Sequence, residues 1–492
     1  MSSIVNKVKV KGWVIGISFF PLFTLTPSSL SAQRTWTLRD CCEYAVEHNV
    51  GIKQQQNQCR QQEIQLNTAK NSRLPDVSGG ISQNFSFGRG LTANNTYSNT
   101  NTSSTSFQVG ASVPVFTGFQ ISNQIKLNQL NLEAATADLE KAKNDVRMQV
   151  AQAYIQILYD MEIAAVARRQ IAIDSMQVVR LEAFVDNGKA SGAELSQQKS
   201  SLANSRLTAT QADNNTRLAV LSLTQLLELP TPDGFQINAQ NIQANAQCTM
   251  HNAQSSMHNA QGTMHNYHAD SLSCDSQLYI VHRELCIDKA LPLPDQIYAE
   301  ALGIKPEIVS QQLRLKGTEY SIKIARAGYY PTISANGGLN TNYYTTSGFN
   351  SDGFGTQLKN NFSQYVGLSL NVPIFNHFQT RNNIRNAKIE QETQQLQLEN
   401  TKKTLYKEIQ QVYYNALNAQ AKERSSYEAV KSSEDAFRLM QAKYENGKAS
   451  ITEFNESKNN YMKAESDLVQ ARYETIYQRA LIDFYRGKEL DF

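Results

Sequence analysis

A run of histidines and methionines near the middle of the chain offers the side chains best suited to chemistry. The heptapeptides MHNAQSS, MHNAQGT and MHNYHAD follow one another from Met250. Imidazole and thioether groups bind copper, so the run is a candidate soft-metal site. Its possible ligands are His251, His258, His265, His268, Met250, Met257 and Met264.

A low-complexity tract in a tolerant external loop explains the same composition without any ligand. We favour the tract, because a seven-residue step lacks the i, i+4 pairing of a preorganised helical site and no supporting acidic shell is evident. The sequence therefore predicts no metal site.

The rest of the sequence carries no catalytic motif. It has no GxSxG, no Walker loop, no HExxH and no clustered pair of acids apart from charges on helix surfaces. The six cysteines form no CxxC pair and no spacing typical of zinc. Without a nucleic-acid-binding signature either, the chain is expected to be no enzyme, to need no cofactor and to bind no nucleic acid.

Two short turns carry further candidate residues. DNGKAS begins at Asp186, and ENGKAS begins at Glu445. Each has a glycine suited to the left-handed position past a helix end, followed by a capping box for the next helix. The pattern occupies Gly188, Ser191 and Glu194 in the first turn, and Gly447, Ser450 and Glu453 in the second. Each turn is predicted to be the tip of a helical hairpin.

The chain repeats itself. VPVFTGFQ from Val113 recurs as VPIFNHFQ from Val372, an offset of 259 residues that the two NGKAS turns share. Upstream, AKNSRLP ending at Pro75 and ARAGYYP ending at Pro331 differ by 256. Two homologous halves, an internal two-fold repeat, are the simplest explanation.

Each half contains a β-hairpin, predicted at 75–116 and 331–375. Apolar and polar residues alternate there with the period of a strand. Polar loops are predicted to join the strands at Gly88–Ser104 and Thr345–Asn360. A soluble sheet would alternate too, but strands of about ten residues with one apolar face match the wall of a membrane barrel. Because four strands cannot close and an open edge cannot lie in lipid, the subunit is expected to oligomerise; a trimer would supply about twelve strands.

Long helices follow each hairpin. No proline occurs from Val115 to Leu229 or after Pro373, which favours uninterrupted helix. The predicted helices cover residues 119–186, 192–228, 378–445 and 451–486. At 1.5 Å per residue the longer ones would reach about 100 Å, so a globular domain cannot contain them and lateral association is expected.

The remaining segments complete the domain organisation. Residues 1–32 combine three lysines, an apolar run and a small-residue end, the pattern of a secretory signal peptide. The first half is predicted at 33–230 and the second at 295–492, each opening with a helix. The linker between them, 231–294, contains a low-complexity insert at 236–276.

Together these features resemble the TolC family of outer-membrane factors. The resemblance rests on the WTLRDCCEYAVEHN opening from Trp36, the paired P-VPxF hairpins, the long helices and the duplicated NGKAS tips. It implies a mainly α fold with a transmembrane β-barrel: a homotrimer in the cell outer membrane with four strands per chain, whose antiparallel helices form a periplasmic tunnel. It also implies a periplasmic adaptor and an inner-membrane pump or exporter as partners.

The resemblance also assigns roles to residues. Adaptor contact maps to the tips, Gly188, Lys189, Ala190, Ser191, Gly447, Lys448, Ala449 and Ser450. An acidic ring at the tunnel entrance maps to Glu453 and Glu456. A gate tyrosine that bonds to an acid maps to Tyr444 and Glu194; the arginine that accompanies it is replaced by Ala449, and Lys448 is its candidate substitute.

The expected function is a passive, gated exit duct of a tripartite efflux or type I secretion system, for drugs, toxic compounds or secreted proteins. Three copies of each glutamate around one axis would favour cations. The alternative is a non-conducting periplasmic coiled-coil scaffold or adhesin, which the amphipathic hairpins argue against. The sequence does not choose the substrate.

Overall fold

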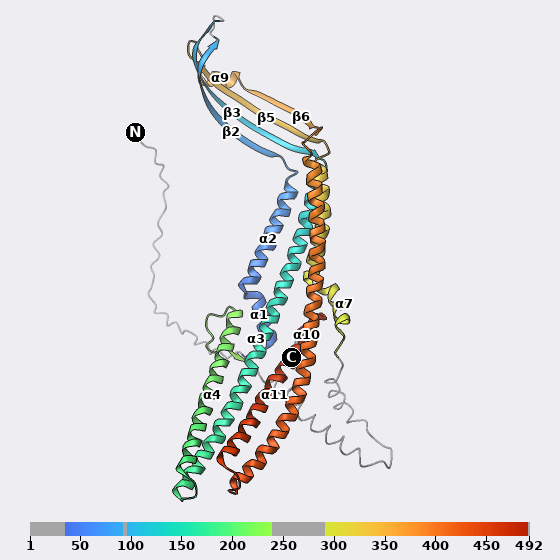
Figure 1. Ribbon diagram of the computed structural model, residues 1–492. Helices are drawn as coiled ribbons and strands as arrows, with labels where there is room; N and C mark the ends of the chain where they lie inside the picture. Colours follow the sequence, from blue (N-terminus) through green and yellow to red (C-terminus); the bar gives the residue numbers. More distant parts are fainter. Residues whose placement is uncertain (1–34, 92–95, 239–290, 491–492) are drawn as a thin grey trace, which may run out of the picture.

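The computed structural model describes residues 35–91, 96–238 and 291–490. The predicted signal peptide, the histidine and methionine run, and the insert from residue 239 onward lie outside these residues. The described chain is an elongated molecule with a β-sheet at one end and two helical hairpins at the other (Figure 1). Among the described residues, no helix combines the length and apolar character needed to cross a lipid bilayer.

Four helices form the two hairpins, and they have matching lengths in the two halves. The first hairpin is α3 (Gln120–Asp186) with α4 (Gly192–Leu226), and the second is α10 (Gln379–Glu445) with α11 (Ile451–Tyr485). The long helices each have 67 residues and the returning helices 35 each. The corresponding sequence predictions were 119–186, 192–228, 378–445 and 451–486, which differ by at most two residues at any end.

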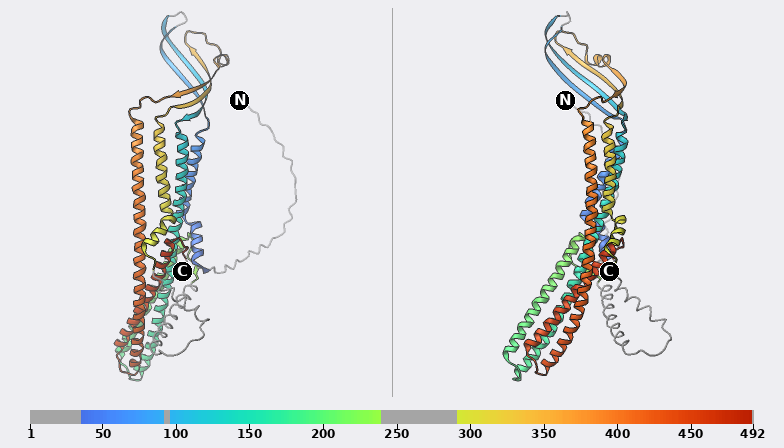
Figure 2. Two further views of the ribbon diagram at one scale, coloured as in Figure 1. Left: turned by 90° about the vertical axis from the view of Figure 1, so that its right-hand side faces the viewer. Right: turned by 45° about the vertical axis from the view of Figure 1, so that its right-hand side comes forward.

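Shorter helices pack beside α3 and α10 to form a single layer of helices between the tips and the sheet. The view in Figure 2 (left) shows α10, α8 (Pro306–Ala327), α3 and α2 (Val50–Asn71) side by side, with α1 (Leu38–His48) and α7 (Pro294–Ile304) near the middle of the molecule. The sequence predicted one opening helix in each half, and this was wrong. The first splits at Asn49, whose carboxamide caps α2, and the second splits before Pro306, which stands at the first turn of α8.

The sheet contains strands from both halves in the order β2-β3-β5-β6, all antiparallel. They are β2 (Asp76–Leu91), β3 (Tyr97–Thr117), β5 (Thr332–Thr346) and β6 (Ser363–Asn371). The register puts most of the aliphatic and phenylalanine side chains of the four strands on one face. The other face carries mainly Ser, Asn, Thr and Gly, together with Tyr344 and Tyr365. Apolar residues on the first face are strongly exposed: Val366 at 94%, Leu368 at 78%, Phe87 at 75% and Ile81 at 73%.

Both predicted loops of the hairpins need correction. Most of Gly88–Ser104 is strand, because β2 and β3 pair as far as Leu91 opposite Tyr97. Polar bonds across the strands hold this extension, and Gln83 Nε2 donates to Ser103 Oγ at 2.8 Å. Thr345–Asn360 contains a short helix, α9 (Phe354–Asn360). Because β6 begins opposite Asn340, the backbone N–H and C=O of Tyr344 lack a β6 partner, and the buried Gln357 amide bonds both.

A left-handed turn joins each hairpin to its long helix. Gly118 and Phe119 have φ values of 61° and 66°, and at the equivalent positions His377 and Phe378 have 54° and 60°. Only glycine adopts this region without steric cost. The second turn therefore holds one more strained side chain than the first.

The start of the linker also differs from its prediction as low-complexity sequence. Gln236–Ile237 forms β4 and pairs in parallel with β1 (Thr35–Trp36). Tyr154 of α3 donates to the Trp36 and Asn238 carbonyls at 3.3 and 3.0 Å. This small sheet covers a core cluster between α1, α3 and the end of α4.

Candidate functional site at the hairpin tips

The two tips are built by the same local geometry. Gly188 and Gly447 are left-handed, with φ of 67° and 69°. Around them, the N–H of Lys189 donates to the Phe184 carbonyl and that of Lys448 to the Lys443 carbonyl, at 2.7 and 2.8 Å. These bonds close the last turns of α3 and α10, as in a Schellman motif.

The turn then presents its short segment to solvent. Gly188, Lys189 and Ser191 are exposed in the first tip, as are Gly447, Lys448 and Ser450 in the second, whereas Ala190 and Ala449 are half-buried. Ala190 contacts a core cluster behind the tips. Both predicted capping boxes are present: Ser191 with Glu194, and Ser450 with Glu453.

Both predicted ring glutamates are exposed on the first two turns of α11. Glu453 accepts bonds from the Ser450 backbone N–H at 2.7 Å and from its hydroxyl at 2.9 Å. These bonds, the backbone one foremost, lower the pKa of the Glu453 carboxyl. Glu456 lies one turn further along the helix, so the two carboxylates follow one edge of α11.

The predicted gate tyrosine faces the interior of the tip region. Tyr444 is half-buried and its ring stacks on Phe454 at a centroid distance of 5.0 Å. Burial raises the pKa of Tyr444, and the nearby charge of Glu194 raises it further. The Glu194 carboxylate accepts its bond from the Ser191 backbone at 3.1 Å, while Lys448 is exposed on the turn. The hydrogen bond between Tyr444 and Glu194 stays a prediction.

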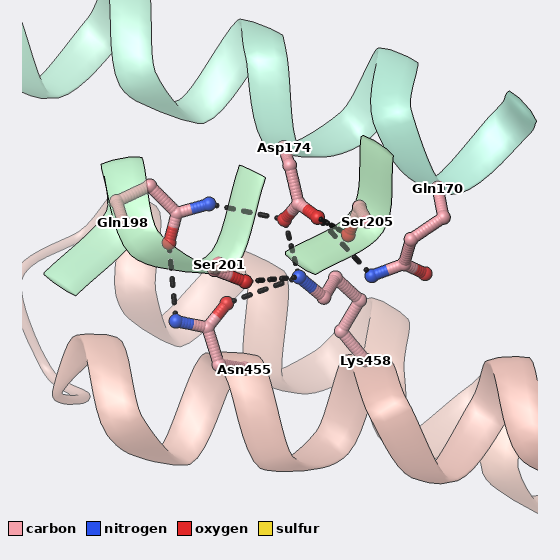
Figure 3. Close-up of polar contacts among 7 residues, drawn as sticks. All are labelled: Gln170, Asp174, Gln198, Ser201, Ser205, Asn455 and Lys458. Carbon is pink, nitrogen blue, oxygen red and sulfur yellow. Dashed lines mark hydrogen bonds and ion pairs between the residues drawn. The ribbon is translucent and has the colours of Figure 1, made fainter. Parts of the chain in front are cut away.

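A buried ion pair that the sequence did not reveal lies behind the tips. Asp174 of α3 and Lys458 of α11 are paired with both side chains at 0% exposure (Figure 3). Asp174 also accepts bonds from Gln198, at 3.0 Å, and from Ser205. Lys458 also donates to Asn455 Oδ1 at 3.2 Å. Because buried charges are costly unless paired and hydrogen-bonded, this network fixes α3 and α4 of the first hairpin against α11 of the second.

Two further ion pairs continue the contact between α3 and α11. Arg169 pairs with Glu465, and Arg472 lies 3.7 Å from Glu162. Glu465 and Arg472 follow Lys458 at steps of seven residues, which keeps all three on one face of α11. We call the three pairs of α11 with α3 the charge ladder: Lys458 with Asp174, Glu465 with Arg169, and Arg472 with Glu162.

The side chains at the tips are mainly small, basic or acidic. Among the described residues, no three His, Cys, Asp or Glu side chains come together as a metal site. Each tip offers a backbone turn with three small or basic exposed positions, and α11 adds the carboxylates of Glu453 and Glu456. These groups are suited to protein contact and to the electrostatics of an opening.

A sheet with one exposed apolar face, carried on antiparallel helices of about 100 Å, defines the class of elongated outer-membrane channel subunits. The family model "Outer membrane efflux protein" matches residues 43–228 and 297–486. The chain belongs to this family, which places it in the outer membrane with its long helices in the periplasm.

Individual proteins support the assignment. Outer membrane protein OprJ of Pseudomonas aeruginosa is 24% identical over 189 residues, which is 38% of this chain and 38% of OprJ. The crystal structure of VceC from Vibrio cholerae aligns with a TM-score of 0.68 at 15% identity, covering 92% of this chain and 97% of that one. The CmeC channel of Campylobacter jejuni aligns with a TM-score of 0.68 at 17% identity, covering 92% and 87%. These structures share the fold.

Proposed function

We propose that the protein is the outer-membrane subunit of a tripartite efflux or type I secretion system, in which a homotrimer forms a passive, gated exit duct. The observation that carries the proposal is the exposed apolar face of the sheet. Side chains such as Val366 and Leu368, at 94% and 78% exposure, are stable in contact with lipid and costly in water.

The open edges of the sheet support the trimer. Within the chain, β3 of the first half pairs with β5 of the second, which leaves β2 and β6 as the edges. Unpaired backbone groups at such an edge cost several kcal/mol each in lipid. Pairing a second-half strand with a first-half strand between copies places β6 of one copy beside β2 of the next. Three copies then close a barrel whose wall faces lipid outside and water inside.

The tips then lie at the periplasmic end of the duct. We assign the turns Gly188–Ser191 and Gly447–Ser450 to contact with a periplasmic adaptor, because their exposed backbone and small side chains allow close approach of another protein. Through the adaptor the duct would serve an inner-membrane pump or exporter, which selects among drugs, toxic compounds and secreted proteins.

The gate is assigned to the same end. Glu453 and Glu456 of three copies would form a ring of carboxylates that favours cations. Tyr444, Glu194 and Lys448 would hold the second hairpin near the first when the duct is closed. The stacking of Tyr444 on Phe454 and its proximity to Glu194 support this assignment.

Fractionation of cell envelopes tests the proposal. The protein should be recovered from outer membranes as a trimer that resists mild detergent and dissociates on heating. Recovery as a water-soluble monomer from the periplasm would contradict the proposal and favour a non-conducting scaffold.

A further inference from the structure

The joint between the two hairpins of one chain has a defined geometry. The returning helix α11 packs on the long helix α3, and the charge ladder lies along this contact. The four helices near the tips follow the order α4, α3, α11, α10, so α4 and α10 lie at the two edges of the chain (Figure 1).

The edge helices are the counterparts of the joint helices. The start and end of α3 plus 259 residues give the start and end of α10, and the same offset converts α4 into α11. A ring of copies therefore repeats the joint in one way only, with the returning helix α4 of one copy on the long helix α10 of the next.

The same offset carries the charge ladder to the edge helices. On α4 its positions become Lys199, Arg206 and Asp213, and on α10 they become Ser433, Glu428 and Ala421. Lys199 and Asp213 are paired within their own hairpin, with Glu182 and Arg168. The ladder positions that would face Lys199 and Asp213 on α10 are Ser433 and Ala421, which are uncharged.

At the middle position of the charge ladder, the edge helices again carry opposite charges, but with the signs exchanged. Arg206 of α4 stands where α11 has Glu465, and Glu428 of α10 stands where α3 has Arg169. Both Arg206 and Glu428 are exposed in the single chain, whereas Glu465, at 20% side-chain exposure, is covered by the joint.

We propose that α4 docks on α10 of a second copy of this chain, with the guanidinium of Arg206 paired to the carboxylate of the neighbouring copy's Glu428. The inference rests on the proposed ring of copies and names the contact that forms it near the tips. It also gives the two joints different strengths. Within a chain, three ion pairs join α11 to α3, and one of them is fully buried. Between chains, the single pair of Arg206 and Glu428 would join α4 to α10.

Charge reversal tests the contact. R206E and E428R should each lower the temperature at which the detergent-solubilised oligomer dissociates, because each places like charges in all copies of the joint. The double variant R206E/E428R restores opposite charges and should recover most of the loss. K431E is the control: it lies on α10 three residues from Glu428, and its counterpart Ala172 is exposed beside the joint on α3, so no change is expected.

A crosslink between the two positions provides the second measurement. The full chain with R206C/E428C, treated with a short bifunctional thiol reagent, should give covalent dimers and trimers, whereas R206C alone and E428C alone should not. If the wild-type protein is oligomeric but the double reversal does not recover stability and no crosslink forms, the inference is overturned and the proposed function stands. A wild-type protein that is monomeric would overturn the inference and the proposed function together.

Discussion

Asp174 and Lys458 show how single residues bind the two halves of the chain into one subunit. They come from α3 and α11, 284 positions apart in the sequence, and meet with no exposure to solvent. The offset of 259 relates Lys458 to Lys199, which lies on α4 with 53% of its side chain exposed and pairs with Glu182. The lysine is therefore part of a buried ion pair in the second half and lies at the surface in the first.

Substitution of this pair should be costly. Asp174→Asn leaves the Lys458 ammonium buried without a counter-charge, and we expect a loss of about 3–5 kcal/mol in the free energy of unfolding. Lys199→Met, the exposed counterpart, should cost less than about 1 kcal/mol. Denaturant unfolding followed by circular dichroism measures both. Equal losses for the two variants would contradict the role given to the buried pair.

The Glu453 carboxylate should keep its charge to a lower pH than an ordinary glutamate. Its pKa is lowered by the Ser450 backbone and hydroxyl, so the carboxylate stays charged where an ordinary glutamate takes up a proton. Its contribution is therefore present above the ordinary glutamate pKa and is lost only as pH falls through the lowered one. In an E456Q channel, the cation preference should persist to a lower pH than in S450A/E456Q, which lacks the hydroxyl bond.

Reversal potentials across a salt gradient, recorded at decreasing pH, measure this difference. E453Q/E456Q should show reduced cation preference at neutral pH, and preference unchanged from the wild type would remove both residues from the entrance ring.

The sequence predicted part of the tip site and could not predict the rest. Gly188 and Ser191 with Glu194 interact within a few residues of one another, so their spacing alone indicated the turn and the cap. The partner of Asp174 depends on how α11 packs on α3, and no local pattern contains that information. A heptad step through Lys458, Glu465 and Arg472 was the available signal, since alternating charges on an otherwise packed helix face indicate a paired surface.

At the scale of elements, the long helices were predictable and the ends of the sheet were not. Lack of proline and glycine over more than 60 residues leaves helix as the favoured state, and caps mark the ends. The extension of β2 and β3 through Ser, Thr and Asn depends on bonds between strands, such as Gln83 to Ser103. Helix α9 depends on Gln357 bonding the free edge of β5. Both are tertiary effects that override local composition.

The two strand-to-helix turns differ in backbone strain. His377 has φ of 54° where the first half has Gly118. His377→Gly should stabilise the protein by about 1 kcal/mol, because it removes a side chain from a left-handed position. Gly118→Ala should destabilise it, since the added Cβ would lie 2.8 Å from Tyr330 Cβ and 2.9 Å from the Ala327 carbonyl oxygen.

Thermal unfolding of the two variants beside the wild type in the same detergent checks the pair of signs. Destabilisation by His377→Gly would show that the histidine side chain contributes contacts that outweigh its backbone strain.

In the whole molecule, elements of the first half contact elements of the second half in the sheet, in the middle helices and near the tips. First-half and second-half elements meet as β3 with β5, α3 with α8, and α3 with α11. The elements left at the edges, β2 with α4 on one side and β6 with α10 on the other, are the counterparts of those that meet. A single chain therefore leaves two edges exposed, and we propose that further copies of the chain cover both.

Conductance of the purified, detergent-extracted protein in a planar lipid bilayer, with its oligomeric mass determined alongside, would show whether the protein forms a membrane channel. We expect a trimer that inserts and gives small openings with a preference for cations, because the proposed ring of Glu453 and Glu456 would narrow the entrance of the duct and favour cations. A protein that remains monomeric and never conducts would show that the exposed face of the sheet is not the wall of a membrane channel.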